Sequence, residues 1–144
     1  MFHRIRSVTP LQDYRLSVQF VEGVTKQYDL KALFDKFPMF NIDDNLFREV
    51  KVDVGGYGIS WNDDLDLSCD ELWEHGEQVD NPFDGLISMK DATTMWNLNE
   101  STLRKSIAYG KLVNGIDVCK FGKQWVVAID ALIREYGQPT IKER

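Results

Sequence analysis

Hydroxyl and cationic side chains follow one another closely in one short segment, residues 100–109. At about 100° per residue, a helix here buries Leu103 and Ile107 on one stripe and turns the polar residues outward. Such side chains can hydrogen-bond phosphate oxygens and base edges. An ordinary amphipathic helix with a solvated face has the same pattern. The polar residues concerned are Ser101, Thr102, Arg104 and Lys105.

The surrounding sequence predicts the elements that position this helix. Capping residues, apolar periodicity and Gly110 indicate two short helices joined by a tight polar turn, followed by a hairpin and a last helix. This order is typical of a winged helix-turn-helix, which places its second helix in a DNA major groove. The expected elements are helices 88–96, 100–109 and 129–136, a turn at 97–99 and two strands around 121–123.

A resemblance supports this prediction. The segment LISMKDATTMWNLNESTLRKSIAYGKL, followed by a hairpin and WVVAIDALIREYG, resembles the MerR/excisionase-type winged helix-turn-helix. The resemblance implies that Ser101, Thr102, Arg104 and Lys105 contact DNA and that a wing at 120–123 lies along the phosphate backbone. This sequence departs from that family in the wing, because the wing of the family carries an Arg-rich strand. With the helical wheel, it gives these candidate DNA contacts: Ser101, Thr102, Arg104, Lys105, Tyr109, Lys111, Lys120 and Lys123.

The N-terminal part predicts a small antiparallel-sheet domain with short helices, so the fold class is α+β. The pattern divides the chain into an interaction or oligomerisation domain (1–80), a linker rich in Pro, Gly, Asn and Asp (81–85) and the winged helix-turn-helix (86–144). The expected N-terminal elements are a strand at 4–8, a hairpin of 14–20 with 24–28, a helix over 30–37, strands 47–54 and 57–61 around Gly55-Gly56, and a helix from the capping box at Ser68 to Gly76.

Residues 3–77 resemble a small bacterial domain of unknown function. The resemblance rests on the order of RIRSVTPLQDYRLSVQF, a glycine-turned strand and GYGISWNDDLDLSCDELWEHG. Members of that family sometimes carry a DNA-binding C-terminal domain, and many are encoded beside candidate toxin genes. The resemblance implies no catalytic residues.

Charge separates the two halves of the chain. Residues 1–85 carry eight Lys/Arg and seventeen Asp/Glu, a net charge of −9, whereas residues 86–144 carry nine and six, a net charge of +3. Opposite charges favour different partners for the two halves. Asp63, Asp64 and Asp66 are the candidate contacts for a basic protein partner. Alternatives for the same residues are a solvated turn before a helix cap and a metal-dependent nuclease that uses Asp64 and Asp66.

The sequence favours no enzyme, metal site or cofactor. A calcium loop needs a glycine at its sixth position, but counting from Asp64 in the acidic run the sixth residue is Cys69. Cys69 and Cys119 lack C-x-x-C spacing and are expected to be buried or half-buried thiols, and His3 and His75 form no ligand cluster. Gly55–Gly58 lacks the phosphate-loop spacing. No apolar run reaches the length of a membrane span and the N-terminus lacks signal-peptide features, so we expect a cytoplasmic protein.

These observations predict a DNA-binding transcriptional regulator. We expect a repressor that binds double-stranded DNA as a homodimer. It would be antitoxin-like, because its acidic domain would bind a basic, toxin-like protein partner. The alternative is a protein-interaction adaptor whose helix-turn-helix binds protein, supported by the modest charge of +3 and the wing with a single Lys120 after Asp117-Val118-Cys119. A carboxylate-dependent metal enzyme is a third class.

Overall fold

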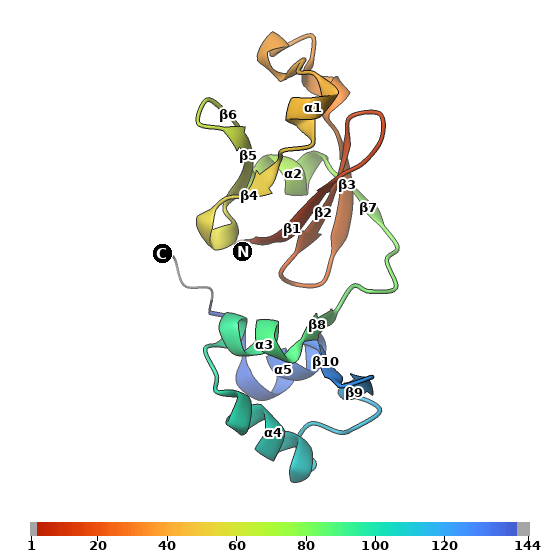
Figure 1. Cartoon of the computed structure of the whole chain (residues 1–144), viewed down its shortest axis with the longest axis vertical. Helices are drawn as coiled ribbons and strands as arrows, with labels where there is room; N and C mark the ends of the chain where they lie inside the picture. The colour runs from red at the N-terminus through yellow and green to blue at the C-terminus, as the bar shows by residue number, and fades with distance from the viewer. Residues whose placement is uncertain (1–2, 141–144) are drawn as a thin grey trace. The chain divides into compact units, whose positions relative to one another are not determined.

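A computed structural model describes residues 3–140 of the chain. The chain divides into two compact units, of which unit 1 ends at Asp84 and unit 2 begins at Gly85 (Figure 1). Residues 81–84, at the end of unit 1, are held by Thr25. The Thr25 hydroxyl donates to the Asp84 carboxylate and accepts from the Asn81 amide. This polar contact fixes the end of unit 1.

Unit 1 contains a four-stranded antiparallel sheet in the order β1-β2-β3-β7. The predicted hairpin forms its centre, and Leu16, Val18 and Phe20 of β2 are buried as the alternating pattern requires. Tyr14 lies just outside β2, with a φ of 57°. The strands are β1 (Ile5–Pro10), β2 (Arg15–Phe20), β3 (Thr25–Asp29) and β7 (Glu77–Val79).

A second antiparallel sheet in unit 1 has the order β4-β5-β6, and short helices connect the two sheets. Its strands are β4 (Lys51–Val52), β5 (Gly58–Asn62) and β6 (Leu65–Ser68). The helices are the 3₁₀ turns η1 (Leu30–Leu33), η2 (Pro38–Phe40) and η3 (Val54–Gly56), and the α-helices α1 (Asp44–Phe47) and α2 (Cys69–His75). The Ser68 hydroxyl caps α2 by accepting from the Glu71 N–H at 3.1 Å.

Two predicted elements of unit 1 form only in part. Of the strand expected over 47–54 only β4 forms, and the segment begins as the end of α1, which Asp43 caps by accepting from the Leu46 N–H at 2.8 Å. Phe47 is fully buried, and its carbonyl accepts the Trp61 indole N–H at 3.0 Å, so tertiary contacts fix this turn of helix. The helix expected over 30–37 forms only the 3₁₀ turn η1, which the Asp29 side chain caps by accepting from the Lys31 N–H at 3.0 Å.

Unit 2 consists of a three-stranded antiparallel sheet in the order β8-β10-β9 and three helices. Its expected helices form, within one residue of the predicted ends. The strands are β8 (Leu86–Ser88), β9 (Val118–Phe121) and β10 (Gln124–Ala128), and the helices are α3 (Met89–Trp96), α4 (Glu100–Ala108) and α5 (Ile129–Tyr136). Its core is formed by Ile87, Met89, Ala92, Trp96, Leu103, Leu112, Val118, Val127, Ile129, Ala131 and Leu132.

The two thiols differ in exposure. Cys69 is buried in unit 1, as expected, but Cys119 is exposed, which corrects the prediction of two buried or half-buried thiols. Cys119 lies on β9, the edge strand of its sheet, where one face is uncovered. Among residues 3–140, no helix is long and apolar enough to span a bilayer.

Candidate nucleic-acid interface

The polar face of α4 is exposed because its apolar residues lie on the opposite side. Leu103 is fully buried, and Ile107 packs against the same core. Ser101 and Lys105 are exposed, and Tyr109 directly after the helix is 84% exposed. The helix therefore presents hydroxyl, ammonium and phenol groups to solvent on one face.

A tight turn fixes α4 against α3. Asn97 adopts the left-handed conformation with a φ of 53°, and the Leu98 N–H donates to the Thr93 carbonyl at 3.0 Å. Asparagine tolerates this region better than most residues, which is why a polar turn serves here. At the start of α3, the Ser88 hydroxyl accepts from the Asp91 N–H at 3.0 Å. Both ends of α3 are thus set by local sequence.

The hairpin of β9 and β10 supplies a second basic element of unit 2. Gly122, with a φ of 60°, occupies its two-residue turn together with Lys123. Lys120 pairs across the hairpin with Trp125, and its ammonium lies 5.4 Å from the centre of the indole ring. Phe121 is 62% exposed. The hairpin therefore displays two lysines and one aromatic ring.

A hollow of about 250 Å³ lies where α3, α4 and the hairpin meet. Its described lining includes three cations from three different elements, Lys90, Arg104 and Lys123, and one carboxylate, Glu100. The Arg104 guanidinium donates to Glu100 at 2.7 Å through Nη2. Such an exposed pair between residues four apart is weak, so an anionic ligand can compete for Arg104. This arrangement is suited to a phosphate group.

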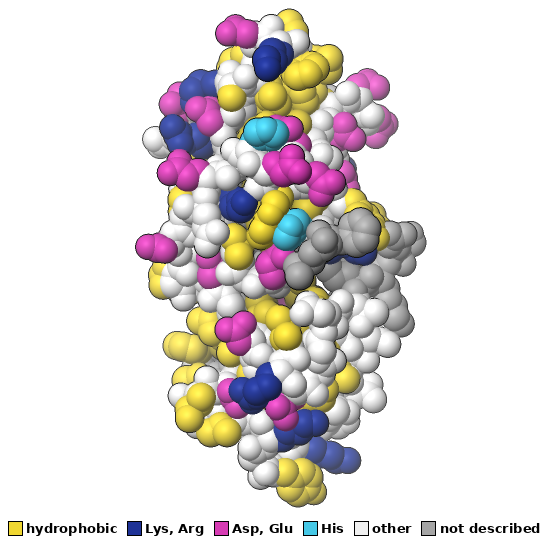
Figure 2. Space-filling model, turned by 180° about the vertical axis from the view of Figure 1, so that it is seen from behind, with side chains coloured by type: hydrophobic (Ala, Val, Ile, Leu, Met, Phe, Trp, Pro, Cys, Tyr) yellow, Lys and Arg dark blue, Asp and Glu magenta, His cyan; other side chains and the backbone are white. Residues whose placement is uncertain are grey.

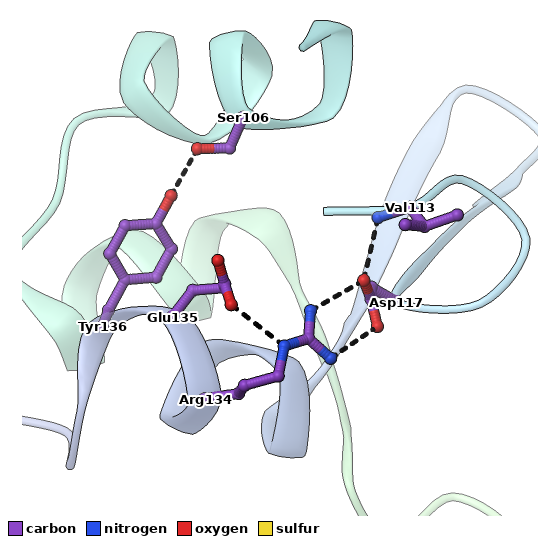
Figure 3. Close-up of polar contacts among 6 residues, drawn as sticks. All are labelled: Ser106, Val113, Asp117, Arg134, Glu135 and Tyr136. Atoms are coloured by element: carbon purple, nitrogen blue, oxygen red, sulfur yellow. Dashed lines mark hydrogen bonds and ion pairs between the residues drawn. The ribbon is translucent and has the colours of Figure 1, made fainter. Parts of the chain in front are cut away.

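Polar contacts with α5 hold both α4 and the start of the hairpin (Figure 3). The Ser106 hydroxyl of α4 hydrogen-bonds the Tyr136 hydroxyl. Asp117, directly before β9, is 5% exposed and accepts two bonds from the Arg134 guanidinium, at 2.9 and 3.2 Å. It also accepts from the Val113 N–H at 2.9 Å. Helix α4 and the start of the hairpin are therefore both fixed to α5.

The same contacts shift ionisation in this cluster. Hydrogen bonding from Arg134, and secondly from the Val113 N–H, lowers the pKa of Asp117 below its ordinary value of 3.8. The bonds to Asp117 and Glu135 in turn raise the pKa of Arg134. Both groups therefore keep their charges at neutral pH, and the ion pair persists there.

The structure brings only part of the predicted DNA-contact set together. Arg104 and Lys123 line the hollow, and Lys120 lies on the adjacent hairpin. Lys111 follows α4, but its ammonium lies 4.9 Å from the centre of the Tyr136 ring, on α5. The residues that remain on the exposed face and end of α4 are Ser101, Thr102, Lys105 and Tyr109.

Sequence reasoning missed the contribution of α3 to the hollow. Lys90 and Thr93 of α3, and Gln124 and Trp125 of β10, also line it. The position of Lys90 in the first turn of a predicted helix was readable from the sequence. Its proximity to Arg104 was not, because that depends on how the two helices pack.

In unit 1, the three aspartates predicted to contact a protein partner are all exposed. Asp63 and Asp64 form the turn between β5 and β6, and Asp66 points outward from β6 between buried Leu65 and Leu67. Among residues 3–140, no group of three His, Cys, Asp or Glu side chains is placed to hold a metal ion. In Figure 2, carboxylate side chains are spread over unit 1, in the upper part of the view.

Comparisons with known proteins place one part of the chain in a family. The family described as "Protein of unknown function (DUF2442)" matches residues 5–93, which include β1 to β8 and the first turn of α3. A solved structure of the Nitrosomonas europaea protein named "Putative DNA Binding Protein NE0471" is similar with a TM-score of 0.46 and 15% sequence identity, covering 78% of this chain and 80% of that one. Among curated proteins, none matches the chain.

Proposed function

The chain belongs to the DUF2442 family of proteins of unknown function, and we propose that it is a DNA-binding transcriptional regulator whose unit 2 is a winged helix-turn-helix. In this proposal α3 and α4 are the two helices, α4 enters the major groove, and the β9–β10 hairpin is the wing. The observation that carries the proposal is the exposed polar face of α4 beside a hollow lined by Lys90, Arg104 and Lys123. This arrangement resembles the MerR/excisionase type in element order.

The chemistry of the two regions suggests different contacts. Ser101 and Lys105 on the exposed face of α4 are placed to meet base edges, and the cations of the hollow are placed to meet a phosphate. Phosphate contacts release counterions from DNA, so binding should weaken steeply as salt rises. The net charge of +3 of residues 86–144 supports this attraction, whereas the net charge of −9 of residues 1–85 opposes it. We therefore assign DNA binding to unit 2 alone.

We further propose that the protein is a cytoplasmic repressor that acts as a homodimer. One helix-turn-helix reads only a few base pairs, so useful specificity requires two copies on a two-fold-related site. Unit 1 supplies protein contacts in this proposal, including those to a basic, toxin-like partner, which makes the regulator antitoxin-like. Its exposed Asp63, Asp64 and Asp66 support a basic partner by charge. The proposal involves no catalysis.

Binding to duplex DNA from upstream of the gene, measured by fluorescence anisotropy at several salt concentrations, tests the proposal. Replacing Arg104 and Lys105 together with Ala should cost about 1–3 kcal/mol for the base contact of Lys105 and should reduce the slope of affinity against salt by about one for the phosphate contact of Arg104. The double variant Arg15→Ala with Lys51→Ala, which removes two exposed cations from unit 1, is the charge-matched control and should bind like the unaltered chain. Equal binding by the Arg104 and Lys105 double variant would move the interface elsewhere.

A second pair of variants separates phosphate contacts from base contacts. Lys90→Ala and Lys123→Ala should weaken binding to the upstream duplex and to a scrambled duplex alike. Each should also reduce the slope of affinity against salt by about one. A loss confined to the upstream duplex would show that these lysines read sequence, contrary to the proposal.

One observation favours the adaptor alternative. Three large side chains of unit 2 are unusually exposed, at 84% for Tyr109, 79% for Ile116 and 62% for Phe121. Exposed apolar side chains are characteristic of protein contacts when they form a patch. A folded chain that binds neither duplex at any salt concentration would favour the adaptor. Metal-dependent catalysis abolished by Asp64→Asn or Asp66→Asn would contradict both proposals.

A further inference from the structure

Unit 1 carries an open groove that is separate from the elements assigned to DNA. Its volume is about 260 Å³, and it lies between the η1–η2 segment on one side and β6 with the start of α2 on the other. The main lining residues are Leu33, Phe37, Phe40, Asp66, Leu67 and Glu71.

The floor and one rim of this groove are apolar. Phe40 and Leu67 belong to the buried core and are 7% and 8% exposed. Phe37 at the rim is 47% exposed, and Met39, two residues later, is 61% exposed. An exposed apolar residue alone needs no explanation, but the exposed ring of Phe37 at an apolar hollow offers surface that a partner could bury.

The other rim is acidic. Asp66 and Glu71 line the groove, and its described lining contains no lysine or arginine. Glu71 is oriented by the Tyr28 hydroxyl, which donates to it at 2.7 Å. Asp63 and Asp64 come directly before β6 in the same hairpin. A ligand of this groove therefore meets an apolar surface on one side and negative charge on the other.

We propose that this groove binds a basic amphipathic segment of a partner protein. An apolar side chain of that segment lies against Phe37, Phe40 and Leu67, and its Lys or Arg residues pair with Asp66 and Glu71. Charge complementarity selects this occupant, because the lining carries two carboxylates and residues 1–85 have a net charge of −9. The inference rests on the proposed protein-binding role of unit 1 and is independent of DNA binding by unit 2.

Selection of a displayed library of random peptides on the full chain tests this inference. Enriched peptides should combine Lys or Arg with apolar residues at regular spacing. In fluorescence anisotropy, Phe37→Ser and Asp66→Lys should each weaken their binding about tenfold or more, because each removes one half of the recognition. The effect of Asp66→Lys should shrink at high salt, whereas that of Phe37→Ser should persist.

Matched controls separate the groove from the rest of unit 1. Phe83→Ser removes a ring that is 70% exposed, and Asp80→Lys reverses an exposed charge, both outside the groove lining. Both controls should bind the peptides normally, and all four variants should bind DNA like the unaltered chain. If the unaltered chain binds the peptides but does not bind DNA, the DNA-binding function is contradicted and the groove assignment is not.

Several outcomes would overturn the groove assignment. The assignment is contradicted if no peptides are enriched or if the enriched peptides lack basic residues. It is also contradicted if Phe37→Ser and Asp66→Lys bind the peptides as tightly as the unaltered chain does. Self-association of the chain that is abolished by Phe37→Ser, measured by sedimentation, would identify a second copy as the occupant instead.

Discussion

The two units differ in how they form their cores, and the difference bears on function. The largest fully buried side chains of unit 1 include the aromatic rings of Phe20 and Phe47, packed between two sheets and short helices. Those of unit 2 are aliphatic: Ile87, Leu103, Leu112, Ile129 and Leu132. An aliphatic stripe covers one side of a helix and leaves the other free. Unit 2 therefore exposes the polar face of α4, whereas the features proposed for binding in unit 1 are a groove and a turn between strands.

Charge reinforces this contrast. The net charge of −9 of residues 1–85 repels a polyanion and attracts basic partners, while the +3 of residues 86–144 does the reverse. In the proposed function, the two halves therefore bind ligands of opposite charge. Four predictions test how independent the two units are.

The largest expected effect is on stability. Leu103→Ala in unit 2 should cost about 2–5 kcal/mol, and Phe47→Ala in unit 1 about 3–5 kcal/mol, because both side chains are fully buried. Each variant should destabilise its own unit only, measured by urea unfolding with NMR signals from both units. Simultaneous loss of signals from both units in either variant would show a single cooperative core.

The thiols should differ strongly in reactivity. Burial, and secondly the charge of Asp70, raises the pKa of Cys69 from 9.0 to about 11. At neutral pH the thiolate of Cys69 is therefore roughly a hundredfold rarer than that of a thiol with the ordinary pKa. Cys119 is exposed. Alkylation at pH 7 followed by mass spectrometry should modify Cys119 first and Cys69 only on unfolding. Cys119→Ser is the control, and rapid modification of that variant would contradict the burial of Cys69.

Acid should destabilise unit 2 through Asp117. A carboxylate with a lowered pKa stabilises the folded state above its unfolded pKa, and this contribution is lost as pH falls through the folded value, here below 3.8. Asp117→Asn should therefore lower stability at neutral pH and flatten its dependence on pH below about 4. Thermal unfolding across this range measures both. Asp130→Asn, which removes an exposed carboxylate of α5, is the matched control.

The smallest expected effect separates stability from binding within unit 2. Glu100→Ala breaks the exposed pair with Arg104 and should change stability by less than about 1 kcal/mol. It frees the guanidinium in the hollow, so affinity for duplex DNA should rise. Asp130→Ala removes a carboxylate from the first turn of α5 and is the matched control. Unchanged affinity for Glu100→Ala would exclude Arg104 from the interface.

Local signals were sufficient to predict the three helices and the hairpin of unit 2, but not β8, which pairs with β10 about 40 residues later. Ser88 caps α3, Asn97 turns the chain, and Gly110 and Gly122 take positive φ values at the expected turns. Each of these depends on the residue's own conformational preference or on a hydrogen bond a few residues away. The exposed face of α4 also follows from helical spacing alone. The candidate contacts on that face were therefore predictable.

Unit 1 was less predictable because its elements depend on distant contacts. Phe47 lies in a run that alternates like a strand, yet its burial and its bond to Trp61 place it at the end of a helix. Strand β7 pairs with β3 about 50 residues earlier, as Thr25 with Val79 shows. No local pattern marks such a partner.

The sequence by itself determined the order of the three helices and the hairpin in unit 2, the acidic and basic halves and the polar face of α4, because these depend on residue type and spacing. Only the tertiary structure decided which charges converge. Lys90 lines the same hollow as Arg104 and Lys123. The ammonium of Lys111 contacts the Tyr136 ring, and Asp66 lines an apolar groove. These contacts depend on how helices and strands pack, and that packing is fixed by the burial of residues far apart in the chain.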